Sequence, residues 1–236
     1  MQDLFLPALT GLFAGAAHVL SGPDHLAAIA PLAVDQRRKT WRLGFLWGLG
    51  HSGGVWVLAL LALLFREALP IDFMSSWGER LVGFVLIGIG LIGLRRLFTV
   101  RVHSHVHDHD GVRHAHVHVH VENPSEEHPI EHAHSHSALG IGTLHGLAGT
   151  SHLLGVLPAL LLPTRLAAGA YVIAYGIGSI AAMTAFSWVM GLIAHRLNRM
   201  GDRMYRMLLG GCCTLSIVLG LYWCVSTLAA PASAYL

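Results

Sequence analysis

Six residues with metal-binding side chains interrupt stretches of this chain that are otherwise apolar: His18, Asp24, His25, His51, His145 and His152. Neutral imidazole nitrogens and a carboxylate together suit nickel, cobalt or zinc, whereas magnesium and calcium prefer an all-oxygen shell and copper(I) prefers sulfur. The residue types therefore predict a divalent transition-metal site with these six side chains as candidate ligands. They leave the identity of the metal open.

The spacing of the first of these residues requires a break in the backbone. His18 and His25 are seven positions apart, so on a continuous helix they would share a face about 10 Å apart, too far to bind one ion directly. Gly22 and Pro23 lie between them, and glycine tolerates unusual backbone angles while proline fits best at a helix start. We therefore expect a helix break that brings the two histidines together and turns Asp24 inward.

An internal repeat relates the histidines near the start of the chain to those in its second half. Residues 18–31 and 145–158 align without gaps and match at six positions, including both histidines of each segment and the closing proline. A shift of one residue also brings the glycines at 48 and 50 onto those at 176 and 178. Two rare histidines in one register indicate a true duplication.

The composition is that of a membrane protein. Of the 236 residues, 54% are hydrophobic and only 12% are charged, and the mean hydropathy is +0.58. Soluble domains carry about 25% charged residues, so a soluble enzyme, a nucleic-acid binder and a disordered protein are excluded. The three cysteines stand in one apolar run and offer no disulfide framework.

Six stretches are predicted to cross a bilayer, whose hydrocarbon core needs roughly 20 apolar residues of helix. They are residues 4–34, 43–65, 80–95 with a start near 73, 139–164, 166–194 and 207–236. Each repeat then contains three spans, an odd number, so the two repeats would lie in opposite orientations, as in secondary transporters with a site near the midplane. The predicted fold is all-α: a polytopic membrane protein of six transmembrane helices in two inverted three-helix repeats, residues 1–97 and 139–236.

The basic residues predict the orientation. Twelve of the 15 lysines and arginines fall in the connections after the first, third and fifth predicted spans. The positive-inside rule places these connections in the cytoplasm and both termini outside, in a multi-pass protein of the cell membrane (inner or plasma membrane) whose N-terminal segment is retained.

Residues 98–138 differ in composition from the rest of the chain. They contain 12 of the 18 histidines, interleaved with aspartates and glutamates. Such a tract cannot bury a core, so we expect a cytoplasmic, disordered His-rich loop. A weak metal buffer is the favoured interpretation of this loop, and a solvated linker is the alternative.

The motif of His18 followed after five residues by Asp24-His25, with Leu-Gly-His-Ser at 49–52, resembles the nickel/cobalt transporter family, especially its compact urease-accessory-like members. The family signature has four residues in the gap, whereas this chain has five. The resemblance implies a divalent-metal permease in which His18, Asp24 and His25 are ligands or selectivity residues and His51 lies nearby. Efflux branches of that family also carry a His-rich cytoplasmic segment, so the direction of transport stays open.

The sequence thus favours a secondary transporter that moves Ni²⁺ or Co²⁺ by alternating access, with no permanent cofactor, no enzymatic activity and no nucleic-acid partner. The expected partners are the ion, the lipid bilayer and a cytoplasmic metallochaperone. The alternatives are an exporter of zinc or another divalent metal, and a membrane sensor or delivery protein for metalloenzyme assembly. An intramembrane metalloenzyme is disfavoured, because no predicted span contains the H-E-x-x-H pairing of a ligand and a general base.

Overall fold

The computed structural model describes residues 2–36, 39–64, 71–99, 101–109, 112–120, 130–148 and 150–229. These residues form eight helices and one two-stranded hairpin, in the order α1 (Gln2–Ser21), α2 (Pro23–Asp35), α3 (Thr40–Leu64), α4 (Ile71–Thr99), β1 (Arg101–His109), β2 (Val112–His120), α5 (Ile130–Leu147), α6 (Thr150–Leu160), α7 (Arg165–Met200) and α8 (Asp202–Ala229).

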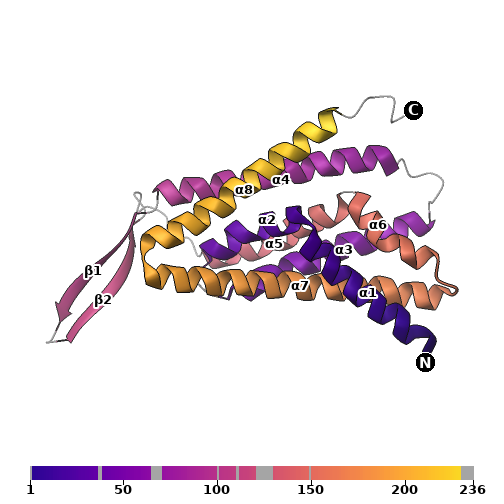
Figure 1. The fold of residues 1–236 in the computed structure, drawn as a ribbon, viewed down its shortest axis with the longest axis horizontal. Helices are drawn as coiled ribbons and strands as arrows, with labels where there is room; N and C mark the ends of the chain where they lie inside the picture. The colour runs from indigo at the N-terminus through magenta and orange to yellow at the C-terminus, as the bar shows by residue number, and fades with distance from the viewer. Residues whose placement is uncertain are drawn as a thin grey trace.

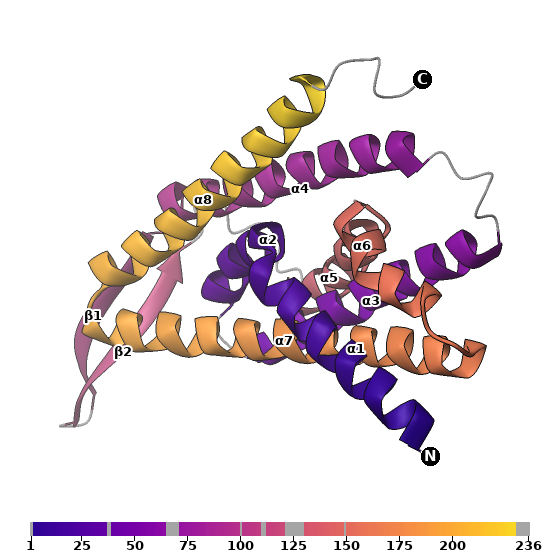
Figure 2. The same ribbon diagram turned by 45° about the vertical axis from the view of Figure 1, so that its right-hand side comes forward.

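The long helices α3 and α7 each contact several other helices. They pack against each other, α1 lies along α7, α5 lies along α3, and α4 pairs with α8 (Figures 1 and 2). Glycines permit these close approaches: a Cβ on Gly83 of α4 would lie 2.8 Å from the carbonyl oxygen of Gly220 of α8. Small residues at helix crossings are typical of membrane proteins, in which packing rather than the hydrophobic effect holds helices together.

Two hydrogen bonds fix the antiparallel register of α3 and α7. The hydroxyl of Ser52 donates to the carbonyl oxygen of Gly176 at 2.9 Å, and the hydroxyl of Ser187 donates to that of Thr40 at 2.7 Å. The start of α3 therefore lies beside the second half of α7. Figure 1 shows the same antiparallel arrangement, since α3 ends at the end of the bundle where α7 begins.

Both predicted spans with a histidine pair are divided into two helices. The predicted span 4–34 separates into α1 and α2 at Gly22, which has an extended backbone (φ −84°, ψ 103°) and precedes Pro23. The predicted span 139–164 separates into α5 and α6 near Ala148. The 11 residues of α6 are too few to cross a bilayer alone, which needs roughly 20. The sequence predicts a break here, weaker than the one at Gly22 and Pro23, from Gly146, Gly149, Thr150 and Ser151, and the division into α5 and α6 agrees with it.

Among the described residues, five helical segments are long and apolar enough to cross a membrane: Leu4–Ser21, Thr40–Leu61, Trp77–Thr99, Arg165–Met200 and Asp202–Leu228. Their outer faces carry large exposed apolar side chains, such as Phe84 and Ile92 of α4 and Val218 and Val225 of α8. Apolar surface of this kind suits lipid rather than water. The prediction of a helical membrane protein is therefore confirmed for these helices, and the number of crossings stays a prediction.

The turns on either side of α7 have clear local causes. The side-chain oxygen of Thr164 accepts a hydrogen bond from the backbone nitrogen of Ala167 at 3.1 Å and so caps the start of α7. The helix ends at Gly201, whose φ of +141° is a backbone angle that favours glycine. The next helix, α8, begins one residue later.

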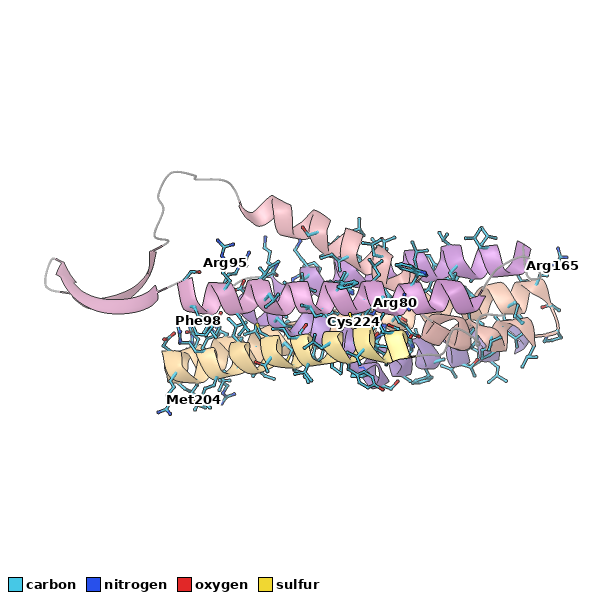
Figure 3. All side chains as sticks on the ribbon, turned by 90° about the horizontal axis from the view of Figure 1, so that it is seen from above. Arg80, Arg95, Phe98, Arg165, Met204 and Cys224 are labelled. Carbon is cyan, nitrogen blue, oxygen red and sulfur yellow. The ribbon has the colours of Figure 1, made fainter. Side chains whose placement is uncertain are left out.

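Charged and apolar residues mark the two ends of the bundle. Arg95, Phe98 and Met204 all lie toward the end that carries the hairpin, whereas Arg165 lies at the opposite end (Figure 3). Near the hairpin end, Arg96 of α4 forms an ion pair with Asp35 of α2. The arrangement agrees with the predicted grouping of the basic connections, and the side of the membrane that each end faces stays a prediction.

The His-rich segment contains regular backbone that the sequence analysis does not predict. Strands β1 and β2 pair antiparallel, with His105 opposite His116, and α5 already begins at Ile130. The physical reason is the alternation of histidine with valine or alanine, because a period of two favours a strand. The predicted loop 98–138 thus includes a hairpin and the first turns of α5, while residues 121–129 lie outside the described part. Its role as a metal buffer stays a prediction.

Candidate metal centre

The break between α1 and α2 places three candidate ligands together. His18 stands in the last turn of α1 and Asp24 and His25 in the first turn of α2. The rings of His18 and His25 lie with their centroids 4.7 Å apart at 81°, less than half of the roughly 10 Å that a continuous helix would impose. A Cβ at Gly22 would overlap the ring of His25 and lie 3.0 Å from Oδ1 of Asp24, so a larger residue at the break would displace these side chains. The predicted effect of the break on the two histidines is therefore confirmed.

The close approach of α3 and α5 supplies the other two histidines. A Cβ on Gly146 would overlap the carbonyl oxygen of His51, and a Cβ on Gly54 would lie 2.6 Å from that of Thr143. Because the two helices touch through their backbones, His51 and the neighbour of Gly146, His145, reach the same space. Their rings lie 5.9 Å apart.

A chain of polar contacts links four of these side chains. The Nε2 atoms of His25 and His51 lie 3.1 Å apart, and Nδ1 of His25 lies 3.0 Å from Oδ1 of Asp24. The second carboxylate oxygen, Oδ2, lies 3.1 Å from Nε2 of His145. A carboxylate only accepts hydrogen bonds, so Nδ1 of His25 and Nε2 of His145 are the protonated nitrogens that donate to Asp24. In the neutral ring of His25, Nε2 then carries the lone pair.

The cluster is shielded from solvent. His25, His51 and His145 are 1%, 0% and 2% exposed, and Asp24 is 9% exposed. An ionised carboxylate at such depth is costly unless it is paired and hydrogen-bonded, and two imidazoles meet that need here. Intramembrane ionisable groups of this kind are by default candidates for function.

The geometry of the donors fits a transition-metal ion. His18, His25 and His51 each offer a nitrogen within 4.8 Å of the others, and Asp24, His25 and His145 form a second such group that shares His25. Two nitrogens bound at about 2.0–2.1 Å to one tetrahedral ion lie about 3.3 Å apart. The 3.1 Å between Nε2 of His25 and Nε2 of His51 is close to this value. Because Nε2 of His25 accepts in this contact, Nε2 of His51 carries the proton, and a small movement together with transfer of that proton away from Nε2 would let both nitrogens bind one ion.

Asp24 is placed to orient histidines as well as to supply charge. Its contact to Nδ1 of His25 leaves Nε2 of the same ring directed toward His51. A carboxylate on the far nitrogen of a ligand histidine fixes the tautomer and the ring orientation and makes the histidine a better ligand. The sequence predicts Asp24 as a ligand, and the geometry adds this second role.

Five of the six predicted site residues are brought together and the sixth is not described at the level of its side chain. His152 belongs to α6 by its backbone, but its side chain lies outside the part of the chain whose side chains are described. Asp24 has no acidic counterpart in the second half of the chain, where residue 151 is a serine. Of the described side chains of the centre, His18, Asp24, His25 and His51 come from the first half of the chain and His145 comes from the second.

Two aromatic residues that the sequence does not predict lie beside the histidines of the centre. The ring of Tyr175 lies 5.7 Å from that of His18, and the ring of Trp47 lies 6.3 Å from that of His145. The signal was present: the shift of 128 that aligns the glycines of α3 and α7 also aligns Trp47 with Tyr175. Aromatic residues are common in membrane helices, so this match alone carried no indication of a site.

Comparisons with known proteins give two relatives. The chain is 33% identical over 225 residues to the Arabidopsis thaliana protein named "Chloroplast protein FOR GROWTH AND FERTILITY 2", across 95% of this chain and 57% of that protein. It is 34% identical over 215 residues to "Chloroplast protein FOR GROWTH AND FERTILITY 1" of the same plant, across 91% of this chain and 57% of that protein. The chain thus spans a little over half the length of the curated relatives it matches.

No family model matches the chain, and no solved structure matches it. The names of the two relatives mention no ligand, and the chemistry of the site therefore carries the functional argument.

Proposed function

We propose that the chain is a secondary transporter for divalent transition-metal ions, with nickel or cobalt as the favoured cargo. The observation that carries the proposal is the buried cluster in which Nε2 of His25 lies 3.1 Å from Nε2 of His51, with Asp24 holding His25 and His145. The cluster joins α1, α2, α3 and α5. A site closed off from solvent and shared by several helices is what alternating access requires, since the ion must be enclosed between release to one side and to the other.

The helix order and packing support two inverted three-span repeats. A broken helix followed by two long helices occurs twice, as α1 to α4 and as α5 to α8, and α1 packs on α7 as α5 packs on α3. Individual contacts repeat as well: a Cβ on Gly178 would overlap the carbonyl oxygen of Leu12, and a Cβ on Gly50 would overlap that of Leu139. Each broken helix then counts as one of the six crossings, as discontinuous helices do in transporters built from inverted repeats.

The donor set supports the choice of metal. Three imidazoles with a fourth imidazole and a carboxylate beside them suit nickel, cobalt or zinc, and the described part of the cluster contains no thiolate that would favour copper(I). The resemblance of the His18, Asp24 and His25 motif to nickel/cobalt transporters makes nickel and cobalt the first choice, with export of zinc as the alternative.

The proposed location is a membrane that the chain crosses several times, with the His-rich segment on the cytoplasmic side. The sequence predicts the cell membrane. The printed names of the two relatives refer to the chloroplast, so an organelle membrane is the second candidate. Fluorescence of a tagged chain in cells of its source organism distinguishes the two.

The test is ion flux into sealed liposomes. We expect the purified chain to carry Ni²⁺ or Co²⁺ to an indicator inside the vesicles, above empty vesicles and above vesicles with His25→Ala. Zn²⁺ is tested in parallel for the alternative cargo. Ion binding without flux would favour a sensor or a metal-delivery protein instead, and absence of both flux and binding for all three ions would refute the proposal.

A further inference from the structure

Two buried aromatic side chains flank the metal centre on opposite sides. Trp47 lies on α3 one turn before His51, with its ring beside His145. The hydrogen bond from Ser52 to Gly176 places Tyr175 of α7 next to α3 just after His51, whereas Trp47 lies before His51. The ring of Tyr175 lies beside that of His18. Both side chains are fully buried. Each of the two histidines related by the repeat is therefore covered by one aromatic ring.

Each of these rings carries a polar atom that lacks a hydrogen bond. Within the part of the chain that the structure describes, neither the Tyr175 hydroxyl nor the Trp47 indole nitrogen has a hydrogen-bond partner. Tyr171, one turn earlier on α7, shows the usual arrangement, because its hydroxyl donates to the carbonyl oxygen of Gly155 at 3.0 Å. A buried polar group without a partner raises the free energy of the state that contains it. Phenylalanine would fill the same space without that penalty.

A buried aromatic residue with an unpaired polar atom occurs at related positions in the two halves of the chain. Trp47 and Tyr175 are 128 positions apart, the shift that superposes the glycines of α3 on those of α7. Their backbone environments repeat too, since a Cβ on Gly15 would overlap the carbonyl oxygen of Tyr175 and a Cβ on Gly142 would overlap that of Trp47. Two unpaired groups at corresponding places in the two halves point to a common role rather than to two separate packing defects.

We propose that Tyr175 and Trp47 are the access residues of the metal centre, one for each side of the membrane. Each ring covers a histidine while the centre is closed, and its polar atom binds water when the path on its side opens. The unpaired groups make the closed state less favourable relative to the open, hydrated states, so they ease opening. This inference rests on the proposed transport function and specifies which residues control entry and exit.

The two residues should serve different chemistry. A hydroxyl both donates and accepts hydrogen bonds, whereas an indole nitrogen only donates. The water molecules around a divalent cation are strong donors, so the Tyr175 oxygen can receive one directly. Trp47 can only donate to water or to an accompanying anion. The Tyr175 side is therefore the side on which the hydrated cation contacts the protein.

The test is Tyr175→Phe in the full chain, with Ni²⁺ as the probe. We expect a higher melting temperature in detergent, because the unpaired hydroxyl is removed, and an equilibrium Ni²⁺ affinity within about twofold of wild type. Ni²⁺ flux in liposomes should fall about tenfold, since removal of one unpaired buried group favours the closed state by about that factor. The matched control is Tyr171→Phe, which removes a paired hydroxyl and should lower the melting temperature while flux stays within about twofold.

Two results would overturn the inference. Wild-type flux in Tyr175→Phe would show that the hydroxyl has no role in access, and a lower melting temperature would show that it has a partner. Trp47→Phe tests the second position independently, and it should also raise the melting temperature and slow flux. This variant keeps the inference testable if Tyr175→Phe does not fold. Absence of flux in the wild-type protein would instead refute the proposed function, and this inference with it.

Discussion

His51 of α3 and Gly146 of α5 touch through their backbones, so closely that a methyl group on Gly146 would overlap the carbonyl oxygen of His51. The contact belongs to the same crossing that carries His145 into the centre. The position of two candidate ligands thus depends on a residue that has no side chain and binds nothing itself.

Gly146→Ala should therefore damage both the fold and the site. We expect a loss of about 1–3 kcal/mol in the free energy of unfolding from overpacking, together with weaker Ni²⁺ binding, because His51 and His145 move apart. Thermal unfolding and calorimetric titration in detergent measure the two effects. Gly140→Ala on the same helix is the control, since a Cβ there meets nothing within 4 Å, and it should be neutral or stabilising by about 0.5–1 kcal/mol. Equal behaviour of the two variants would contradict the described crossing.

Local chain chemistry made the first half of the centre predictable. Gly22 followed by Pro23 predicts a helix break from local sequence. The ring centroids of His18 and His25, on either side of this break, lie 4.7 Å apart. The apolar runs likewise predicted the long helices, because lipid forces the backbone to satisfy its own hydrogen bonds.

The features of the site that could not be predicted from the sequence depend on tertiary contacts. The hydrogen bond from Ser52 to Gly176 sets the register of α3 on α7, and nothing in either segment alone determines that register. Tyr175 lies beside His18 because α7 meets α1 at Gly15, and Trp47 lies beside His145 because α3 meets α5 at Gly142. The second break, near Ala148, lacks a proline, so the sequence predicts only a weaker break there, although the structure divides the segment into two separate helices.

His51→Ala tests whether α3 supplies a ligand. Removal of an imidazole that lies 3.1 Å from its neighbour in the cluster should weaken Ni²⁺ binding by at least about a hundredfold, more than loss of an outer-shell partner. The control is His195→Ala on α7, an exposed histidine near the end of that helix, which should bind Ni²⁺ as the wild type does. Equilibrium dialysis with radioactive Ni²⁺ measures both, and similar affinities for the two variants would remove His51 from the site.

Replacement of residues 103–136 by a Gly/Ser linker of equal length tests the His-rich segment. If the segment collects ions for the centre, flux at saturating Ni²⁺ should persist while the concentration for half-maximal flux changes. The centre itself contains none of the replaced residues, so its affinity in detergent should match that of the wild type. Complete loss of flux would contradict the role of a buffer and would make the segment part of the transport path.

Asp24→Asn tests the link between charge and orientation. An amide keeps one acceptor oxygen for Nδ1 of His25, but its NH₂ group cannot accept the hydrogen bond that Nε2 of His145 donates to Oδ2. We expect Ni²⁺ affinity to fall about 10- to 100-fold, as for other outer-shell partners of ligand histidines, and flux to be abolished because the buried negative charge is lost. Melting temperatures should show that the variant folds. The control is Asp35→Asn on the same helix, which breaks only the partly exposed pair with Arg96, an interaction worth about 0–1 kcal/mol. If Asp24→Asn carried Ni²⁺ at the wild-type rate, the carboxylate would be excluded from the centre and the histidines would have to bind the ion without it.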